Sequence, residues 1–301
     1  MMIIAFDIGG TMTKYGVFNV ISGNPELMVK GEFPSLAGQG GPVMVNRLCE
    51  EVSRLKASYL VEGIAISTAG QIDPYQGYVV FASDNIPNYT GMHLKAQLES
   101  QFNVPVSVEN DVNCFLLGEC RTAQISQNVL AITLGTGIGG AIMAEGKLIR
   151  GEGFSAGEVG HIQLVKNGKA CTCGGSGCFE QYASTKALKN LVQTKLGDVD
   201  LIDFFENCKS GHVPSLQIFE IWLEDLTDGL KSLIHVLNPG KVIIGGAIAA
   251  QGDYLESAIK RLLKDKLMPS YADVLEVSVS RNGNISNLLG AVSHFMTLIA
   301  T

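Results

Sequence analysis

One short stretch of the chain concentrates residue types that bind a metal ion. Between Glu158 and Glu180, three of the seven cysteines (Cys171, Cys173 and Cys178) fall within eight positions, and His161 precedes them. Thiolate and imidazole are ligands that Zn²⁺ prefers, and three Cys with one His complete a closed tetrahedral site. The intervening glycines let the backbone turn tightly enough for these side chains to converge. The stretch therefore predicts a zinc-stabilised loop.

Two other interpretations of this stretch stay open from the residues alone. The cysteines are a chance cluster in a glycine-rich loop, or two of them form a disulfide. The carboxylates Glu158 and Glu180 at its ends are not needed by a four-ligand zinc site. Their presence on both sides indicates that the metal holds in place a loop with another task.

Two glycine-rich turns each follow an apolar strand pattern and precede another strand pattern. The first is Asp7-Ile8-Gly9-Gly10-Thr11, and the second is Leu134-Gly135-Thr136-Gly137-Ile138-Gly139-Gly140. Such turns expose backbone N–H groups to a phosphate, the threonine hydroxyl adds a donor, and Asp7 is placed to hold Mg²⁺ through water. Either turn alone is also an ordinary hairpin. The matched pair predicts an internal duplication whose two turns hold one polyphosphate.

A polar segment follows the predicted strand over residues 104–108. It reads Glu109-Asn110-Asp111-Val112-Asn113 and leads into an apolar helix. Ligand sites in α/β proteins lie beyond the carboxyl ends of strands, so a carboxylate here is well placed to act as a base. The alternative is that Asn110 or Asp111 only caps the helix. A third strand-and-glycine turn, ending in Gly245-Gly246, is a place where backbone could meet a nucleoside.

Around these motifs, hydrophobic periodicity predicts alternating helices and strands, as in crossover connections onto a parallel sheet. The predicted helices cover residues 42–57, 94–102, 114–119, 185–195, 201–208, 215–237, 254–268 and 285–300. The further predicted strands cover residues 3–6, 13–17, 63–67, 129–133, 142–144, 241–244 and 274–280. The segment 68–74 is predicted as a turn. The pattern indicates an α/β fold.

Composition narrows the class of protein. Of 301 residues, 46% are hydrophobic and 17% are charged, which indicates a globular chain. A net charge of −7 without a basic block argues against nucleic acid as a partner. Neither a signal peptide nor a long apolar run is present, so we expect no membrane and a reducing cytoplasm. In that compartment the remaining cysteines are expected to be buried apolar residues: Cys49, Cys114, Cys120 and Cys208.

The motifs, taken in order along the chain, resemble those of the ROK family, which joins bacterial repressors, open reading frames and sugar kinases. The most specific part of the resemblance is the stretch from Glu158 to Glu180, and the resemblance covers essentially the whole chain. It implies an ATP-dependent hexose kinase on an actin-like, ribonuclease-H-like, duplicated two-domain α/β fold. The lobes implied are residues 1–120, joined by a closing helix 285–301, and residues 121–284, which carry the zinc loop 158–180.

The resemblance also implies a role for each matching residue. Asp111 is expected to be the general base for the sugar hydroxyl. The residues expected to bind the sugar are Asn85, Asn110, Asp111, Glu158, His161 and Glu180. Those expected to bind ATP and Mg²⁺ are Asp7, Gly9, Gly10, Thr11, Gly135, Thr136, Gly137, Gly139, Gly245 and Gly246. Structural Zn²⁺ is expected on His161, Cys171, Cys173 and Cys178. His161 would thus bind zinc with one ring nitrogen and the sugar with the other.

The expected substrate is the 6-OH of glucose or a close relative, because Glu158, His161 and Glu180 are similar to the set in glucokinase-like members. N-acetylmannosamine, N-acetylglucosamine, fructose, allose and β-glucosides are alternatives, and a homodimer or homotetramer is expected. A sugar-sensing transcriptional regulator of the family is the non-enzyme alternative, and a sugar-binding protein without activity is another. Such regulators carry an N-terminal helix-turn-helix, whereas this chain begins at its first predicted strand.

Overall fold

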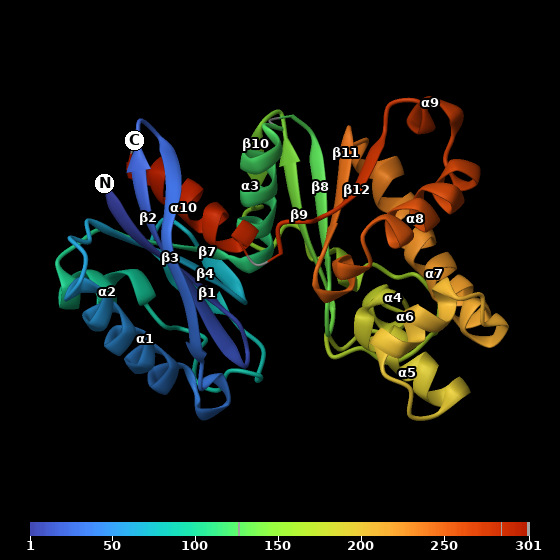
Figure 1. Ribbon diagram of the computed structural model, residues 1–301, viewed down its shortest axis with the longest axis horizontal. Helices are drawn as coiled ribbons and strands as arrows, with labels where there is room; N and C mark the ends of the chain where they lie inside the picture. The colour runs from blue at the N-terminus through green and yellow to red at the C-terminus, as the bar shows by residue number, and fades with distance from the viewer. Residues whose placement is uncertain (126, 284, 300–301) are drawn as a thin grey trace. The chain divides into compact units, whose positions relative to one another are not determined.

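The computed structural model of the protein describes residues 1–125, 127–283 and 285–299. It has two compact units, each built around one five-stranded sheet (Figure 1). Unit 1 comprises Met1–Ile125, Arg150–Ala156 and Asn284–Thr301, and unit 2 comprises Ser126–Ile149 and Gly157–Gly283. The short segment Arg150–Ala156 therefore packs with unit 1, although the chain on both sides of it belongs to unit 2.

The sheet of unit 1 has the order β3-β2-β1-β4-β7. The first three strands are antiparallel neighbours, whereas β4 and β7 run parallel to β1. The strands are β1 (Met2–Ile8), β2 (Met12–Ile21), β3 (Asn24–Pro34), β4 (Gly63–Thr68) and β7 (Val106–Asn110), and a separate hairpin holds β5 (Gln71–Asp73) and β6 (Tyr78–Phe81). Strand β4 is buried along its whole length, as its apolar sequence predicts for a central parallel strand.

Helices cover both faces of this sheet (Figure 1). The helices are α1 (Gly41–Lys56), α2 (Leu94–Phe102), α3 (Asp111–Ala123) and α10 (Ile285–Ile299), with a 3₁₀ turn at η1 (Ala37–Gln39). Apolar residues of α1 and α2 form one core with the sheet, and residues of α3 and α10 form a second core on the opposite face. Alternate residues of each strand supply the two cores, because successive side chains of a strand point to opposite faces.

Helices α3 and α10 approach each other closely because each has a glycine at the crossing. A methyl group added at Gly118 would overlap the carbonyl of Ser286, and one at Gly290 would overlap the carbonyl of Cys114. Ser286 also donates a hydrogen bond to the buried carboxylate of Glu119. The C-terminal helix is therefore fixed tightly against α3.

The sheet of unit 2 has the order β10-β9-β8-β11-β12, with the same pattern of antiparallel and parallel neighbours as the first sheet. The strands are β8 (Val129–Leu134), β9 (Ile138–Ala144), β10 (Lys147–Ile149), β11 (Lys241–Gly245) and β12 (Glu276–Val279). The helices are α4 (Glu180–Ala183), α5 (Thr185–Leu196), α6 (Leu201–Lys209), α7 (Val213–Leu237), α8 (Asp253–Lys266) and α9 (Pro269–Ala272), with 3₁₀ turns at η2 (Val159–His161) and η3 (Ala247–Gln251). Helix α7 contacts α4, α5, α6 and α8, and its Trp222 is fully buried in the shared core.

Most of the predicted elements are confirmed within a few residues, but others differ, and the short elements β6, β10, α4 and α9 were not predicted. The segment 68–74, predicted as a turn, contains β5, because Gln71 to Asp73 pair with β6. Strand β3 was not predicted, since its residues are mostly exposed and lack an apolar alternation. Strand β12 covers only part of 274–280. The predicted closing helix extended to Ala300, which with Thr301 lies outside the described residues.

No helix in the described part of the chain is long and apolar enough to cross a membrane.

Candidate active site

In unit 1, three polar residues are neighbours in the strand register near the carboxyl ends of adjacent strands. The strand register places Asp7 beside Ser67, and Ser67 beside Glu109. Ser67 donates a hydrogen bond of 2.9 Å from its hydroxyl to Oδ1 of Asp7. This edge is the one at which ligand sites of parallel sheets form.

Asp7 is a mostly buried carboxylate held by hydrogen-bond donors. Besides Ser67, the amide of Asn287 donates to Oδ1 of Asp7 over 3.0 Å. Burial raises the pKa of Asp7, and the hydrogen bonds from Ser67 and Asn287, together with the charge of Lys14, oppose that rise. Lys14 lies opposite Asp7 in the β1–β2 ladder. These donors favour the charged form of the carboxylate, whereas burial disfavours it.

The segment from Asn110 to Asn113 begins helix α3, and its first two residues have different roles. Asn110 is the N-cap, and its side-chain oxygen accepts hydrogen bonds from the backbone N–H groups of Val112 at 2.9 Å and Asn113 at 3.1 Å. Its amide nitrogen donates to Gly70 O and to Oδ1 of Asp111, both at 3.0 Å. Asp111 is therefore the first residue of the helix, where the helix dipole favours negative charge.

Glu109, directly before this segment, is almost fully buried and well bonded. Its Oε1 accepts from the amide nitrogen of Asn113 at 3.0 Å and from the backbone N–H of Asn110 at 2.9 Å. Its Oε2 lies 2.8 Å from Nε and 2.7 Å from Nη2 of Arg150. In the same segment as Arg150, the ring of Phe154 packs edge-on against Tyr75, with ring centroids 6.2 Å apart. The Arg150–Ala156 segment thus supports the strand that leads to Asp111.

The first glycine turn is closed by backbone bonds and exposed at its tip. Gly9 N–H donates to Met12 O over 3.1 Å, and Ser35 N–H donates to Thr11 O over 2.9 Å. Gly10 and Thr11 are exposed, and a methyl group at Gly10 would meet nothing within 4 Å. The sugar-binding candidate Asn85 lies in an exposed loop between β6 and α2.

In unit 2, the other two glycine turns gather at the end of β8. Gly246 has a φ of 89°, and a methyl group on it would overlap the carbonyl of Leu134. The hydroxyl of Thr185 also donates to Leu134 O over 3.0 Å. A methyl group at Gly137 would overlap the carboxylate of Glu180. The structure therefore brings together a phosphate-binding candidate turn, Gly246 and one carboxylate of the sugar-binding set.

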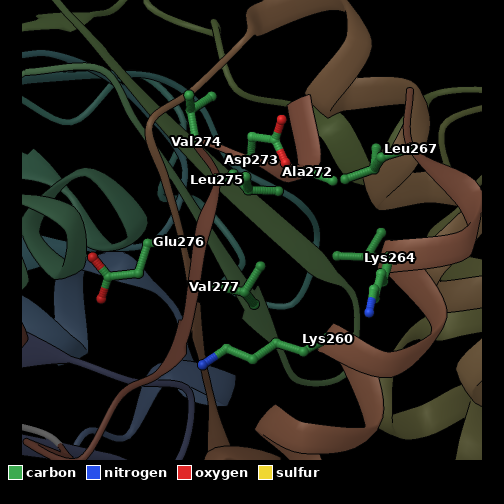
Figure 2. A pocket seen from close by; sticks show the side chains of 10 residues that line it. Lys260, Lys264, Leu267, Ala272, Asp273, Val274, Leu275, Glu276 and Val277 are labelled. Atoms are coloured by element: carbon green, nitrogen blue, oxygen red, sulfur yellow. The ribbon is translucent and has the colours of Figure 1, made fainter. Parts of the chain in front are cut away.

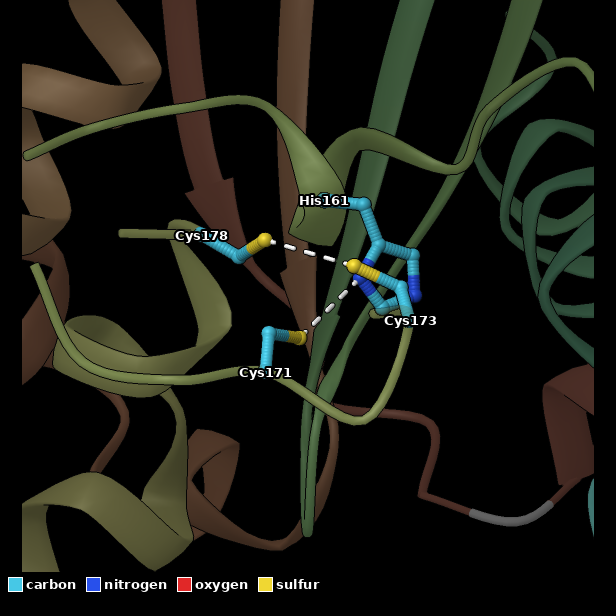
Figure 3. Close-up of side chains that lie close together, drawn as sticks. All are labelled: His161, Cys171, Cys173 and Cys178. Atoms are coloured by element: carbon cyan, nitrogen blue, oxygen red, sulfur yellow. Dashed lines mark hydrogen bonds between the residues drawn. The ribbon is translucent and has the colours of Figure 1, made fainter. Parts of the chain in front are cut away.

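The four predicted zinc ligands converge (Figure 3). Their ligand atoms all lie within 4.8 Å of one another: His161, Cys171, Cys173 and Cys178. Sγ of Cys173 and Sγ of Cys178 are 3.6 Å apart, and Sγ of Cys171 is 3.6 Å from Nδ1 of His161. Ligands about 2.3 Å from one ion lie about 3.8 Å apart in a tetrahedron, so these spacings fit zinc. A backbone N–H at Gly175 lowers the pKa of Cys173, which favours the thiolate that binds metal.

His161 presents its two ring nitrogens to different groups. Nδ1 faces the cysteine cluster, whereas Nε2 lies 3.9 Å from Oε2 of Glu158. Glu180 lies 3.8 Å from Nδ1 through its Oε1, and the same oxygen accepts from Sγ of Cys171 at 3.2 Å. With a metal bound to Nδ1, Nε2 would carry the proton and would be a donor toward Glu158 or toward a small molecule beside it.

Sequence reasoning did not assign a site role to Ser67, Glu109, Arg150 or Asn287. Ser67 ended a predicted buried strand, and Asn287 lay in a helix interpreted as core. Only the strand register places Ser67 beside Asp7, and only the packing of α10 brings Asn287 to both motifs. The sequence signal that could have indicated a role for Asn287 is its position as a polar residue beside buried positions of an apolar helix.

A pocket of about 440 Å³ lies away from these residues in unit 2 (Figure 2). It is formed by α8 and by the segment that leads into β12, with Leu267 and Val277 among its apolar walls and Lys264 among its charged ones. None of the predicted site residues lines it. The pocket is therefore separate from the predicted chemistry.

Comparisons with known proteins match the chain over almost its whole length. The model of the ROK family matches residues 3–297. A glucokinase of Thermotoga maritima is 29% identical over 310 residues, which cover 97% of this chain and 96% of that one. A xylose repressor of Bacillus spizizenii is 30% identical over 267 residues, which cover 85% of this chain and 68% of the repressor.

A solved structure shows the same similarity in three dimensions. The ROK family glucokinase from Streptomyces griseus, in complex with glucose and AMPPNP, superposes with a TM-score of 0.81 at 28% sequence identity. The match covers 97% of this chain and 98% of that one. Every motif described above lies within residues 3–297, the range that the family model matches.

Proposed function

The chain belongs to the ROK family, and on that premise we propose that it is an ATP-dependent sugar kinase that phosphorylates the 6-OH of glucose or a close relative. The observation that carries the proposal lies in unit 1. Asp111 begins a helix beside Asn110, and the amide of Asn287 joins its backbone to Asp7, which precedes a glycine turn. This pairs a candidate base with a candidate phosphate and metal site, which are the two elements that phosphoryl transfer to a hydroxyl requires.

Asp111 is proposed as the general base. A sugar hydroxyl is a weak nucleophile, so a carboxylate must accept its proton as the phosphoryl group arrives. The helix dipole favours negative charge at the first position of α3, and the bond from Asn110 fixes the orientation of this carboxylate. Asn110, held as the N-cap, keeps its amide close to the same place.

The glycine turns are proposed to hold ATP. The missing Cβ atoms of their glycines suit a close approach of phosphate oxygens, with Thr11 and Thr136 adding hydroxyl donors. The residues proposed for this role are Asp7, Gly9, Gly10, Thr11, Gly135, Thr136, Gly137 and Gly139, with Gly245 and Gly246 beside the nucleoside. Mg²⁺ bound to the phosphates would supply neutralisation of the charge that develops during transfer.

The cysteine cluster is proposed to hold structural zinc, which orients the sugar-binding residues near it. Zinc on Nδ1 of His161 would leave Nε2–H as a donor to a sugar hydroxyl. The residues proposed to hold the sugar are Asn85, Asn110, Glu158, His161 and Glu180. Several fixed acceptors and donors suit a hexose, because a site built to bond a hydroxyl rejects analogues that lack it.

We also propose that the two sheets of matching topology are the halves of a duplicated, actin-like fold of the ribonuclease-H type. The support is the shared strand order and the shared placement of a glycine turn after the first strand of each sheet. The lobes proposed from the sequence are residues 1–120 with 285–301 and residues 121–284.

The test is a coupled ATP-turnover screen with Mg²⁺ present, across hexoses, N-acetylhexosamines and β-glucosides. We expect a single strong responder, with glucose the first candidate and N-acetylmannosamine, N-acetylglucosamine, fructose and allose the alternatives. The product's phosphate position, read by NMR, checks transfer to the 6-OH. Absence of turnover with every sugar would reject the kinase proposal.

The second candidate function is a sugar-responsive regulator, favoured by the identity to the xylose repressor. A regulator of this kind would show a sugar-dependent rise in melting temperature without any ATP turnover. The net charge of −7 weighs against direct DNA binding by these residues. The same sugar panel, measured by thermal shift and by turnover in parallel, separates the two functions.

A further inference from the structure

One side chain of the C-terminal helix contacts two motifs that are more than a hundred residues apart in the sequence. Asn287 lies in the first turn of α10. Its amide nitrogen donates to Oδ1 of Asp7 over 3.0 Å and to the backbone oxygen of Asp111 over 3.3 Å. The same amide therefore bridges the strand end that carries Asp7 and the helix start that carries Asp111.

The orientation of this amide follows from its partners. A carboxylate oxygen and a backbone carbonyl only accept hydrogen bonds, so the nitrogen of Asn287, and not its oxygen, must face them. That nitrogen has two hydrogens, and the two acceptors use both. The bridge is therefore fully satisfied and has a single arrangement.

The helix that carries Asn287 is itself fixed in place. Next to it, Ser286 is fully buried and bonds Glu119 of α3. The glycines Gly118 and Gly290 allow no added methyl group at the crossing of the two helices. The first turn of α10 is thus packed tightly against α3, and such support by neighbouring elements is what a positioning group needs.

At Asp7, two donors meet the same oxygen. Ser67 and Asn287 both bond Oδ1, so they fix the rotation of the carboxylate, and Oδ2 would be the oxygen that faces a hydrated metal ion. Both bonds also oppose the rise in the pKa of Asp7 that burial causes. The amide of Asn287 therefore orients the carboxylate of Asp7 and favours its charged form. Its second hydrogen bond holds the backbone oxygen of Asp111.

We infer that Asn287 is a positioning residue that sets the spacing between the proposed base, Asp111, and the proposed phosphate and metal ligand, Asp7. This inference rests on the proposed kinase function. It assigns no contact with substrate to Asn287. Its prediction is that loss of the bridge slows the transfer step and weakens the binding of Mg²⁺–nucleotide, and leaves sugar affinity unchanged.

The experiment compares the full-length parent with Asn287→Leu, which has a similar shape without donors, and with Asn287→Asp, which puts a carboxylate against Asp7. For Asn287→Leu we expect kcat to fall on the order of 100-fold, as misplacement of about 1 Å does. The Kd of the sugar should stay within twofold of the parent by calorimetry. AMPPNP with Mg²⁺ should bind at least tenfold more weakly, and Asn287→Asp should be at least as impaired in both respects.

The matched control is Ser293→Ala, which removes a hydrogen bond within α10, from Ser293 to Leu289 O, and touches neither Asp7 nor Asp111. It should leave kcat within threefold of the parent. If Asn287→Leu keeps kcat within threefold, or if its loss is matched by Ser293→Ala, the positioning role is wrong and the kinase proposal stands. If the parent shows no turnover, the kinase proposal fails, and the binding of AMPPNP with Mg²⁺ still decides the inference. Unchanged binding in Asn287→Leu, or no binding to the parent, overturns it.

Discussion

At the scale of single residues, the chemistry proposed depends on one carboxylate. Oδ1 of Asp111 accepts hydrogen bonds from Asn110 and from the backbone N–H of Val112, both at 3.0 Å. These donors fix the group and stabilise its charged form, which a base must have before it accepts a proton.

Asp111→Asn should lower kcat by about 1,000-fold, because the amide cannot accept the hydroxyl proton and general-base catalysis contributes about 10²–10⁴-fold. The Kd of the sugar should change little, since asparagine keeps the size and the hydrogen-bonding oxygen. Steady-state turnover and calorimetry measure the two quantities. Turnover within tenfold of the parent would show that Asp111 is not the base.

The cysteine cluster supports a second prediction at this scale. Cys173→Ala removes one of the four ligand atoms that lie within 4.8 Å of one another, so bound zinc should fall below one half per chain. Sugar affinity should fall at least tenfold, because Nδ1 of His161 loses the metal that orients its ring. Elemental analysis and calorimetry check these outcomes. Cys49→Ala, at a buried cysteine outside the cluster, is the control and should keep its zinc.

At the scale of elements, the segment Arg150–Ala156 ties the strand that precedes Asp111. The carboxylate of Glu109 is 1% exposed, and the paired Arg150 is 22% exposed. Removing one partner of a buried ion pair leaves a charge without compensation, which costs about 3–5 kcal/mol. We therefore expect the removal of one partner to cost more free energy of unfolding than the intact ion pair contributes to stability.

Arg150→Met should lower the free energy of unfolding by about 3 kcal/mol, measured by urea denaturation. The double variant Glu109→Gln/Arg150→Met should recover part of that loss, because the buried charge is gone as well. Arg261→Met breaks an exposed ion pair with Glu220 and should cost less than about 1 kcal/mol. Equal losses in Arg150→Met and Arg261→Met would contradict the interpretation of Glu109 as a buried charge held by Arg150.

At the scale of the whole molecule, stability should depend on pH through a buried histidine. His294 lies in α10 with Nδ1 3.9 Å from Oε2 of Glu109, and its Nε2 is buried without a hydrogen-bond partner among the described residues. Burial lowers the pKa of His294 to about 4, and the nearby charge of Glu109 only partly opposes this. The folded state therefore holds this side chain neutral.

Because the pKa is lower in the folded chain than the ordinary value of about 6.5, the unfolded chain binds the proton first as pH falls. The stability that the chain gains by holding His294 neutral is fully present above pH 6.5. It is lost as pH falls from about 6.5 toward 4, and the free energy of unfolding decreases by about 3 kcal/mol in total. His294→Leu should flatten this part of the stability profile, measured by urea denaturation at pH 5 to 7. His93→Asn, at an exposed histidine, should keep the parent's slope, and a slope unchanged in His294→Leu would contradict the assignment.

Many of the structural elements, the motifs and the family were predicted from the sequence alone, because the patterns that indicate them involve residues close together in the chain. Gly-rich turns after apolar strands, the Cys-x-Cys spacing and the helical periodicities depend on neighbouring residues, and the family indicated by the motifs is confirmed. The helix over residues 94–102 has the predicted bounds, and the ligand atoms of the cysteine cluster converge as its spacing predicts. The roles assigned to individual site residues stay predictions.

Other features were decided only by tertiary structure. Ser67 reaches Asp7 through strand register, Arg150 reaches Glu109 because a short segment packs with unit 1, and Asn287 reaches two motifs because glycines let α10 pack closely on α3. Each contact joins residues at least 41 positions apart. A sequence pattern reports periodicity over about one turn or one strand, and it carries no information on which distant elements pack together. The sequence thus determined the groups able to do chemistry, and packing decided which side chains hold them in place.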